Sequence, residues 1–214
     1  MIPGRALPWA YPALVLAAMA AGGAAARRSS ASLALSAGQR WALGTGAFCG
    51  AMLGAKLPFA LTAPGGPLSA AAWLSSGKTL VAGLAGGYLG VEAAKRLAGV
   101  RVKTGDSFAV PAALSVGLGR LSCLAAGCCY GTPTRLPWGV DFGDGLARHP
   151  AQLYEAAFHL AAAAGLARLK AVGALRLQLM KLYVIAYAAF RFLSEFLRPE
   201  PKVLLGLSAY QAGS

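Results

Sequence analysis

Six long apolar runs constrain this chain more than any other feature of its sequence. A stretch of about 20 apolar residues can cross the hydrocarbon core of a bilayer as an α-helix, because a helix satisfies its own backbone hydrogen bonds. We therefore predict an all-α fold, a polytopic bundle of about six transmembrane helices in one integral membrane domain over residues 1–214. Glycines at four-residue spacing in the third run predict a close helix–helix contact. The predicted spans are about 9–26, 41–62, 79–94, 107–126, 152–167 and 177–197.

The composition favours a membrane protein over a soluble one. Hydrophobic residues make up 57% of the 214 residues and charged residues only 13%, whereas a typical soluble domain is about 25% charged. The formal net charge of +13 does not indicate nucleic-acid binding, because the basic residues lie in loops between apolar runs and form no nucleic-acid-binding module. We expect membrane lipid as a partner, and no nucleic acid.

Basic residues are unevenly distributed over the predicted loops. The loops after the first, third and fifth spans hold eleven lysines and arginines, whereas the termini and the other loops hold six. Because basic loops stay on the cytoplasmic side, this bias predicts that both termini lie outside, in the periplasm. The long loop 128–150 would then lie on the outer face, after the fourth span. The first apolar run lacks a clear small-residue cleavage site, so we interpret it as a retained helix.

Two arginines, Arg120 and Arg191, lie inside apolar runs. A charge at membrane depth costs roughly 3 kcal/mol or more, so each arginine should face a partner or a polar cavity, and together they suggest an anion site. Tyr187, Arg191 and Glu195 share one helix face, where Glu195 can hold a guanidinium whose other donors bind phosphate. Two alternatives stay open: an Arg191–Glu195 pair that only ties helices together, and an Arg120 that extends to the outer interface.

The segment 148–155 opens the fifth predicted span. Its His149 is a candidate general base, because the unperturbed pKa of histidine is near neutral. The alternative is a plain helix start, with a proline near the first turn. Tyr154 and Glu155 would lie at the outer end of the helix, where they can hydrogen-bond to loops.

Three cysteines, Cys123, Cys128 and Cys129, lie at the end of the fourth span. A zinc site needs four ligands in suitable geometry, and the absence of a CxxC spacing argues against one, so we predict no metal. On an oxidising face, a disulfide between Cys123 and Cys128 is a second interpretation. Packing as small apolar side chains is the third, and the one that we favour.

Four stretches follow one another in a recognisable order: Gly119–Gly131, Pro137–Val140, Arg148–Glu155 and Tyr187–Pro201. Together they resemble the prolipoprotein diacylglyceryl transferase family, with weaker likeness at 206–211 and around Lys56, where the family often has arginine. The resemblance implies an enzyme of the bacterial inner membrane. Such an enzyme moves the diacylglyceryl group of phosphatidylglycerol to the lipobox cysteine thiol behind a prolipoprotein signal peptide, and it releases glycerol 1-phosphate. It implies no cofactor and no metal.

Carried over by position, the resemblance implies that Arg120 and Arg191 are the two essential arginines, supported by Tyr187 and Glu195. It also implies that five further residues bind substrate: Gly131, Gln152, Tyr154, Glu155 and Lys56.

The chain departs from the family pattern at three polar positions. Cys123 stands where asparagine is usual, Cys128 where glutamate is usual, and Val81 where a histidine serves as a proposed general base. We therefore expect His149 to take over proton transfer. We also expect a last span after 206–211 to be missing. These departures keep two alternatives open: a related membrane lipid transferase with another acceptor, and a non-catalytic membrane protein that binds anionic phospholipid.

Overall fold

The computed structural model describes residues 9–62, 66, 69–70, 73, 79–199, 202–204 and 207–208. The chain divides into two compact units, one formed by Met1–Ser32 with Lys103–Ser214 and the other by Leu33–Val102. Helices account for most of the described residues, so the predicted all-α class is confirmed.

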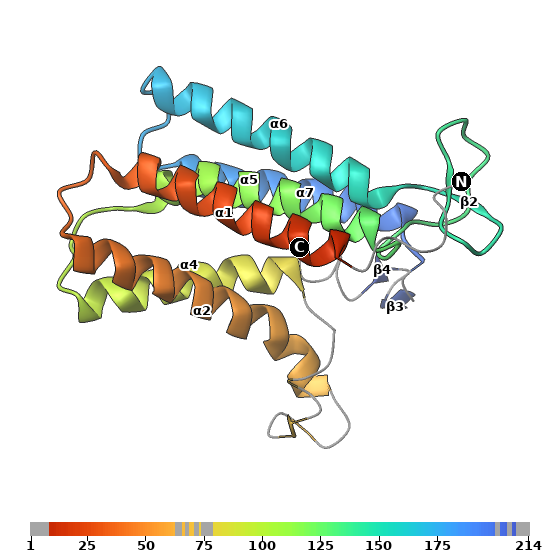
Figure 1. The fold of residues 1–214 in the computed structure, drawn as a ribbon, viewed down its shortest axis with the longest axis horizontal. Coiled ribbons are helices and arrows are strands. Elements are labelled where there is room, and N and C mark those ends of the chain that lie inside the picture. The colour runs from red at the N-terminus through yellow and green to blue at the C-terminus, as the bar shows by residue number, and fades with distance from the viewer. Residues whose placement is uncertain are drawn as a thin grey trace. The chain divides into compact units, whose positions relative to one another are not determined.

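In the first unit, α5 (Gly105–Ala125) packs against α1 (Ala10–Ser30), α6 (Ala151–Ala171) and α7 (Leu179–Ser194). Figure 1 shows these four helices side by side, with α5 in green among them. A 3-10 turn, η1 (Glu195–Leu197), extends α7. The buried face of α5 repeats small residues every four positions, at 109, 113 and 117, which lets its neighbours approach closely.

Two short antiparallel hairpins accompany these helices. β1 (Val140–Asp141) pairs with β2 (Ala147–Arg148), and β3 (Lys202–Leu204) pairs with β4 (Leu207–Ser208). The Asp141 carboxylate accepts hydrogen bonds from two backbone N–H groups of the β1–β2 turn, which explains why the turn forms there. The predicted loop 128–150 therefore contains a hairpin that the apolar pattern did not show.

The second unit consists of α2 (Ala37–Thr62) and α4 (Leu80–Leu97). Glycines of the two helices face one another at their crossing. A Cβ at Gly50 would lie 2.3 Å from the backbone oxygen of Gly86, and one at Gly90 would lie 2.0 Å from that of Gly46. Only glycine permits this approach, so the small-residue contact predicted for the third run is confirmed.

Each of the six predicted spans coincides with one of these helices. Two of them, α1 and α5, are long and apolar enough to cross a membrane. Large apolar side chains on the outside of the helices include Leu16, Leu89 and Ile185, each at least 65% exposed, which suits an apolar surrounding better than water. The number of crossings and the side on which each loop lies remain predictions.

Candidate functional site

Asp106 aligns the helices that carry the two intramembrane arginines. Its carboxylate, in the first turn of α5, accepts hydrogen bonds from the backbone N–H groups of Leu177 (2.5 Å) and Leu179 (3.0 Å) at the start of α7. The unpaired N–H groups of a helix start favour such a carboxylate. Measured from this contact, Arg120 lies about 21 Å along α5 and Arg191 about 18 Å along α7 at 1.5 Å per residue. The two guanidinium groups therefore reach the same end of the unit.

Glu155, near the start of α6, is the centre of the site. Its side chain is only 1% exposed and forms an ion pair with Arg120 of α5. One carboxylate oxygen also lies 2.5 Å from Arg198 Nη2 and 3.7 Å from Arg191 Nη1. Three guanidinium groups from separate segments thus converge on one buried carboxylate, and Arg120 does not simply extend to an interface.

The buried face of α7 and η1 brings the second carboxylate to this cluster. Glu195 Oε2 forms an ion pair with Arg191 Nη2, at 2.7 Å across one helical turn, as the four-residue spacing predicts. Tyr187 is buried one turn earlier, with its ring 4.7 Å from the ring of His159. His159 also lies 2.9 Å from the hydroxyl of Tyr183, so this histidine contacts α7 in the helix core. The Arg191–Glu195 pair therefore lies within a larger buried cluster of charged side chains.

Among the residues that the structure describes, the cluster holds more cationic than anionic side chains. Three guanidinium groups face two carboxylates there, so the arginines outnumber the carboxylates by one. An excess charge among buried groups is costly unless an anion compensates for it. Guanidinium forks match the oxygens of a phosphate group. The arrangement therefore suits one singly charged phosphodiester.

Arg198 is a site residue that the sequence pattern does not indicate, because its position after the last predicted span groups it with the loop cations that orient the chain. In the structure, its backbone N–H bonds to the carbonyl oxygen of Glu195 at the end of η1, and its side chain turns inward to Glu155 with 9% exposure. One signal was available: Arg198 follows Glu195 by three residues, within helical reach of the same face.

Gly131 lies where three backbone segments meet. Its N–H donates to the carbonyl oxygen of His149 at 2.8 Å, and the N–H of Thr132 donates to that of Leu197 at 2.8 Å. A Cβ at Gly131 would lie 2.6 Å from the Leu197 oxygen and 2.7 Å from the His149 Cβ. The position requires glycine for this close approach, which joins the loop after α5 to the start of α6 and the end of η1.

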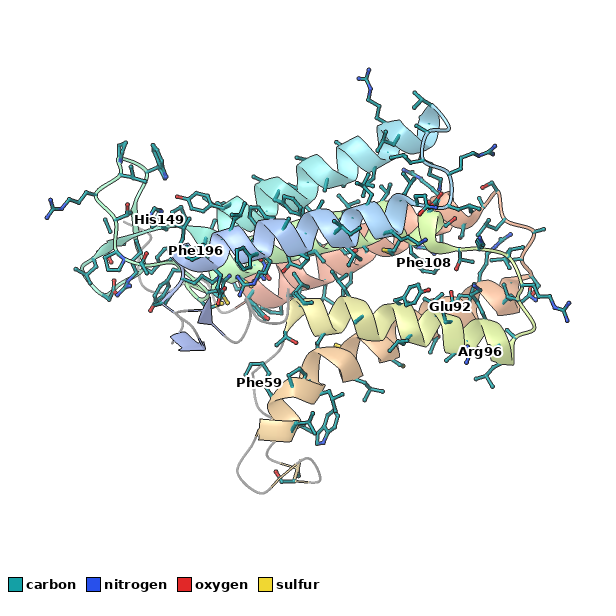
Figure 2. The ribbon with its side chains drawn as sticks, turned by 180° about the vertical axis from the view of Figure 1, so that it is seen from behind. Phe59, Glu92, Arg96, Phe108, His149 and Phe196 are labelled. Atoms are coloured by element: carbon teal, nitrogen blue, oxygen red, sulfur yellow. The ribbon has the colours of Figure 1, made fainter. Side chains whose placement is uncertain are left out.

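His149 sits at the end of a short hydrogen-bond chain. The indole N–H of Trp138 donates to the hydroxyl of Tyr154 at 2.8 Å, and that hydroxyl lies 3.2 Å from His149 Nδ1. Figure 2 shows His149 and Phe196 of η1 toward one end of the first unit and Phe108 of α5 toward the other. The structure therefore gives the predicted base a fixed orientation at the end where the arginines converge.

The three cysteines come together because of how α5 ends. The helix closes at Gly127, whose φ of +62° is the left-handed conformation that glycine adopts readily. The N–H of Cys128 then bonds back to the carbonyl oxygen of Cys123 at 3.1 Å, and that of Gly127 to Leu124 at 3.1 Å, the pattern of a Schellman cap. This cap folds Cys128 over Cys123. Cys129, with φ +64°, turns its side chain to the same side.

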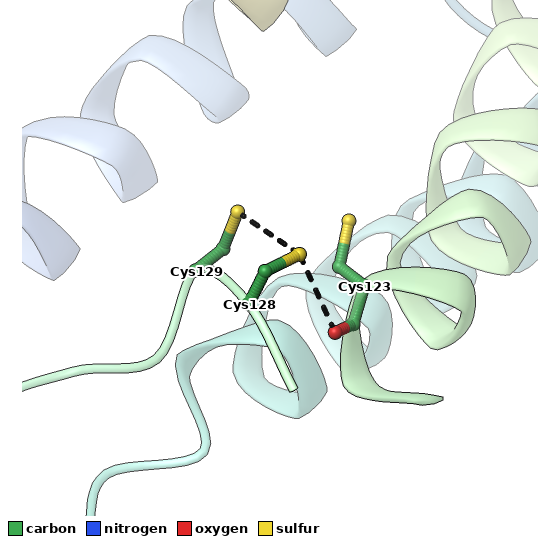
Figure 3. Close-up of side chains that lie close together, drawn as sticks. All are labelled: Cys123, Cys128 and Cys129. Atoms are coloured by element: carbon green, nitrogen blue, oxygen red, sulfur yellow. Dashed lines mark hydrogen bonds between the residues drawn. The ribbon is translucent and has the colours of Figure 1, made fainter. Parts of the chain in front are cut away.

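The result is a group of three free thiols, shown in Figure 3. All three sulfur atoms lie within 4.8 Å of one another, and Cys129 Sγ lies 3.7 Å from Cys128 Sγ. Hydrogen bonds within the group, first with Cys123 and then with Cys128, lower the pKa of the Cys129 thiol. The disulfide interpretation is not realised in this structure. The spacing argument against a metal also fails, because the cap brings together cysteines that have no CxxC spacing.

Three of the remaining predicted residues are placed as follows. Gln152 is fully buried on α6 and donates from Nε2 to the carbonyl oxygen of Cys128 at 2.5 Å, so it contacts the thiol segment. Lys56 is a buried side chain on α2 of the second unit, and its role in substrate binding stays a prediction. Val81 lies in the first turn of α4. Most of the weak motif 206–211 lies outside the described residues.

A comparison with known families assigns the chain. The family model described as prolipoprotein diacylglyceryl transferase matches residues 6–214, nearly the whole sequence. The chain belongs to this family. With two helices that are long and apolar enough to cross a bilayer, this family member is a membrane protein.

Three relatives illustrate how far the similarity extends, and each carries the name phosphatidylglycerol–prolipoprotein diacylglyceryl transferase. The Clostridium tetani protein is 38% identical over 96 residues, which cover 42% of this chain and 39% of the relative. The Geobacter sulfurreducens protein is 39% identical over 137 residues, which cover 58% of this chain and 50% of the relative. The Rhodospirillum centenum protein is 35% identical over 185 residues, which cover 78% of this chain and 65% of the relative. The chain thus spans between two fifths and two thirds of these relatives.

Proposed function

We propose that this chain is a phosphatidylglycerol–prolipoprotein diacylglyceryl transferase. It takes the diacylglyceryl group of phosphatidylglycerol, transfers it to the lipobox cysteine thiol of a prolipoprotein, and releases glycerol 1-phosphate. Family membership and the names of the relatives support the reaction class. The observation that carries the proposal is the convergence of Arg120, Arg191 and Arg198 on Glu155, with one positive charge in excess.

The charge of this cluster suits both the substrate and the leaving group. Phosphatidylglycerol carries one negative charge on its phosphodiester, which the excess cation balances. As the bond between the glyceryl carbon and the phosphate oxygen breaks, a second negative charge develops on the departing phosphate monoester. Fixed guanidinium donors stabilise such a developing charge, because they need no reorganisation during the step. Arg120 and Arg191 supply these donors, and Glu155 and Glu195 hold them in place.

The acceptor thiol must lose its proton to attack the glyceryl carbon. His149 takes this proton, with its ring oriented by Tyr154 and Trp138. Tyr187, buried on α7, interacts electrostatically with Arg120 and Arg191. Gly131, Gln152 and Tyr154 shape the adjoining loop. Lys56, on α2 of the second unit, is a further proposed substrate-binding residue.

The proposed placement follows the sequence pattern. Residues 1–214 form one domain in the inner membrane with six crossings, both termini are periplasmic, and the loop 128–150 faces outward. This puts the arginine end of the first unit near the outer leaflet. There, a prolipoprotein signal peptide presents its cysteine after crossing, and phosphatidylglycerol can enter laterally.

The test is a transfer assay with purified protein, phosphatidylglycerol vesicles and a lipobox peptide, reading glycerol phosphate release and peptide mass. We expect a peptide that gains one diacylglyceryl group. Arg191→Lys keeps the charge but loses the fork, so its rate should fall about a hundredfold, as when one transition-state donor is removed. Arg135→Lys, at an exposed arginine, is the matched control.

Three other results would each replace the proposal. Glycerol phosphate release without a change in peptide mass would indicate a related transferase with another acceptor. Bound phosphatidylglycerol without turnover would indicate a non-catalytic lipid-binding protein. An Arg191→Lys variant with the wild-type rate would remove the arginine cluster from the reaction.

A further inference from the structure

The thiol group of Cys123, Cys128 and Cys129 has the dimensions of a metal site. In a tetrahedral zinc site with Zn–S bonds of 2.3 Å, the sulfur atoms lie about 3.8 Å apart. Here the Cys128 and Cys129 sulfur atoms are 3.7 Å apart, and all three lie within 4.8 Å of one another. The three sulfur atoms therefore already lie close to the separation that one zinc ion requires.

The backbone holds these thiols together independently of any ion. The Schellman cap fixes Cys128 over Cys123 through main-chain hydrogen bonds. The buried amide of Gln152 fixes the carbonyl oxygen of Cys128 from α6. Cys129 is held at φ +64°, a conformation that is costly for a residue with a side chain. Strain of this kind persists where the surrounding structure determines it, and it is common at functional sites.

The number of the ligands favours a site that is open to a fourth ligand. Structural zinc sites use four protein ligands, whereas catalytic ones use three and leave one position open. Within the described part of the chain, the group contains three donors. Cys129 is exposed, so the open position is accessible from outside.

We propose that Cys123, Cys128 and Cys129 bind Zn²⁺, and that the thiol of the acceptor peptide occupies the fourth position. This inference rests on the proposed transferase function, because it assigns the site a role in activating that thiol. A thiol bound to zinc is deprotonated at neutral pH. Arg120 precedes Cys123 by one helical turn, so the bound thiolate would lie beside the cluster that holds the phosphodiester.

The step balances without any other reactant. The S–H bond of the acceptor breaks, and its proton passes to His149. The sulfur lone pair forms the new C–S bond to the glyceryl carbon, and the C–O bond electrons leave with glycerol 1-phosphate. Zinc undergoes no redox change. The thioether product is a weaker ligand than a thiolate, so the modified peptide can leave.

The first experiment measures the metal directly, with no reference to activity. Reduced, chelator-stripped protein is titrated with Co²⁺ in the absence of oxygen and then with Zn²⁺. We expect near-ultraviolet thiolate-to-cobalt absorption and tetrahedral visible bands at one Co²⁺ per chain, displaced by one equivalent of Zn²⁺. Cys128→Ser and Cys129→Ser should lose these bands, whereas Cys49→Ser, at an exposed cysteine on α2, should keep them. Absence of the bands in the wild-type protein, or their persistence in both cluster variants, would overturn the proposal.

The second experiment separates the metal from the proposed function. A lipobox peptide should shift the cobalt bands, and a peptide with serine in place of cysteine should not. Removing zinc should slow transfer by about 30-fold at pH 7, because a free thiol with a pKa near 8.5 is only about 3% ionised there, and the loss should shrink by pH 9. Stripped protein that transfers at the full rate would overturn the zinc role while leaving the transferase function intact. Cobalt bands that respond to the peptide, in a protein without transfer activity, would support the site and refute the transferase.

Discussion

Gln152 on α6 donates a hydrogen bond from its side-chain amide to the backbone carbonyl oxygen of Cys128, at 2.5 Å between the two atoms. The residue is fully buried, so the bond forms without competition from water. Gln152, in the first turn of α6, therefore holds the segment that follows α5. Because α6 also carries Glu155, this bond connects the arginine site to the thiol group.

Gln152→Leu should loosen the thiol segment without removing a thiol. The unpaired Cys128 carbonyl should cost about 1–3 kcal/mol of stability. The Co²⁺ affinity should fall about tenfold, as when a residue that orients a metal ligand is lost. Isothermal titration with Co²⁺ checks the affinity. Gln178→Leu, at an exposed position before α7, is the control and should change neither quantity. An unaltered Co²⁺ affinity in Gln152→Leu would separate this bond from the metal site.

Glu155→Gln should destabilise the first unit strongly. Its loss leaves three buried or half-buried guanidinium groups without their common carboxylate, and breaking a buried ion pair costs about 3–5 kcal/mol. Unfolding of the variant in detergent, monitored by circular dichroism, measures this loss of stability. Glu92→Gln removes a more exposed partner of Lys95 on α4 and should cost less than about 1 kcal/mol. Equal effects of the two changes would contradict the central place of Glu155.

Arg198→Lys should lower the transfer rate although Arg198 was not expected from the sequence. Lysine keeps the charge but offers no planar fork to share between Glu155 and a phosphate, so we expect a loss of about a hundredfold. Steady-state release of glycerol phosphate measures it. If the rate matched that of the Arg135→Lys control, Arg198 would have to be removed from the site.

Gly131→Ala should impair folding, whereas Gly119→Ala should not. A methyl group at 131 would collide with the Leu197 carbonyl oxygen and the His149 Cβ, at 2.6 and 2.7 Å, and the neighbouring backbone must move. At 119, on α5, nothing lies within 4 Å, and alanine should stabilise the helix by about 0.5–1 kcal/mol. Melting temperatures of the two variants should move in opposite directions. A shared direction would show that the close approach at 131 is relaxed in solution.

Structural features that depend on local periodicity could be predicted from the sequence. The six helices follow from apolar runs, and the Arg191–Glu195 pair follows from a spacing of four residues, since neighbours on one helix are fixed by its pitch. The position of Glu155 at the centre of the site could not be predicted from local periodicity. It depends on α6 running back beside α5 and on the Asp106 contact that aligns α5 with α7.

The thiol group shows a different reason for a missed prediction. Metal-binding motifs are recognised by their spacing along the chain, but here a helix cap brings the thiols together. Gly127 was the available signal, since a glycine directly after an apolar helix predicts a left-handed residue and a backbone that folds back. Applied to Gly127, that rule would have placed Cys128 over Cys123.

The cap at the end of α5 has a consequence for how such a site arises in evolution. Its bonds join main-chain atoms of residues 123, 124, 127 and 128, so they depend on Gly127 and not on the side chains at 123 and 128. Any helix that ends in this way already holds two side chains together, whatever they are. A pair of point mutations, with a third at the next position, can convert such an end into a trithiol without a new loop or an inserted residue. Helix ends of this type in other membrane proteins are therefore ready scaffolds for engineering thiolate sites.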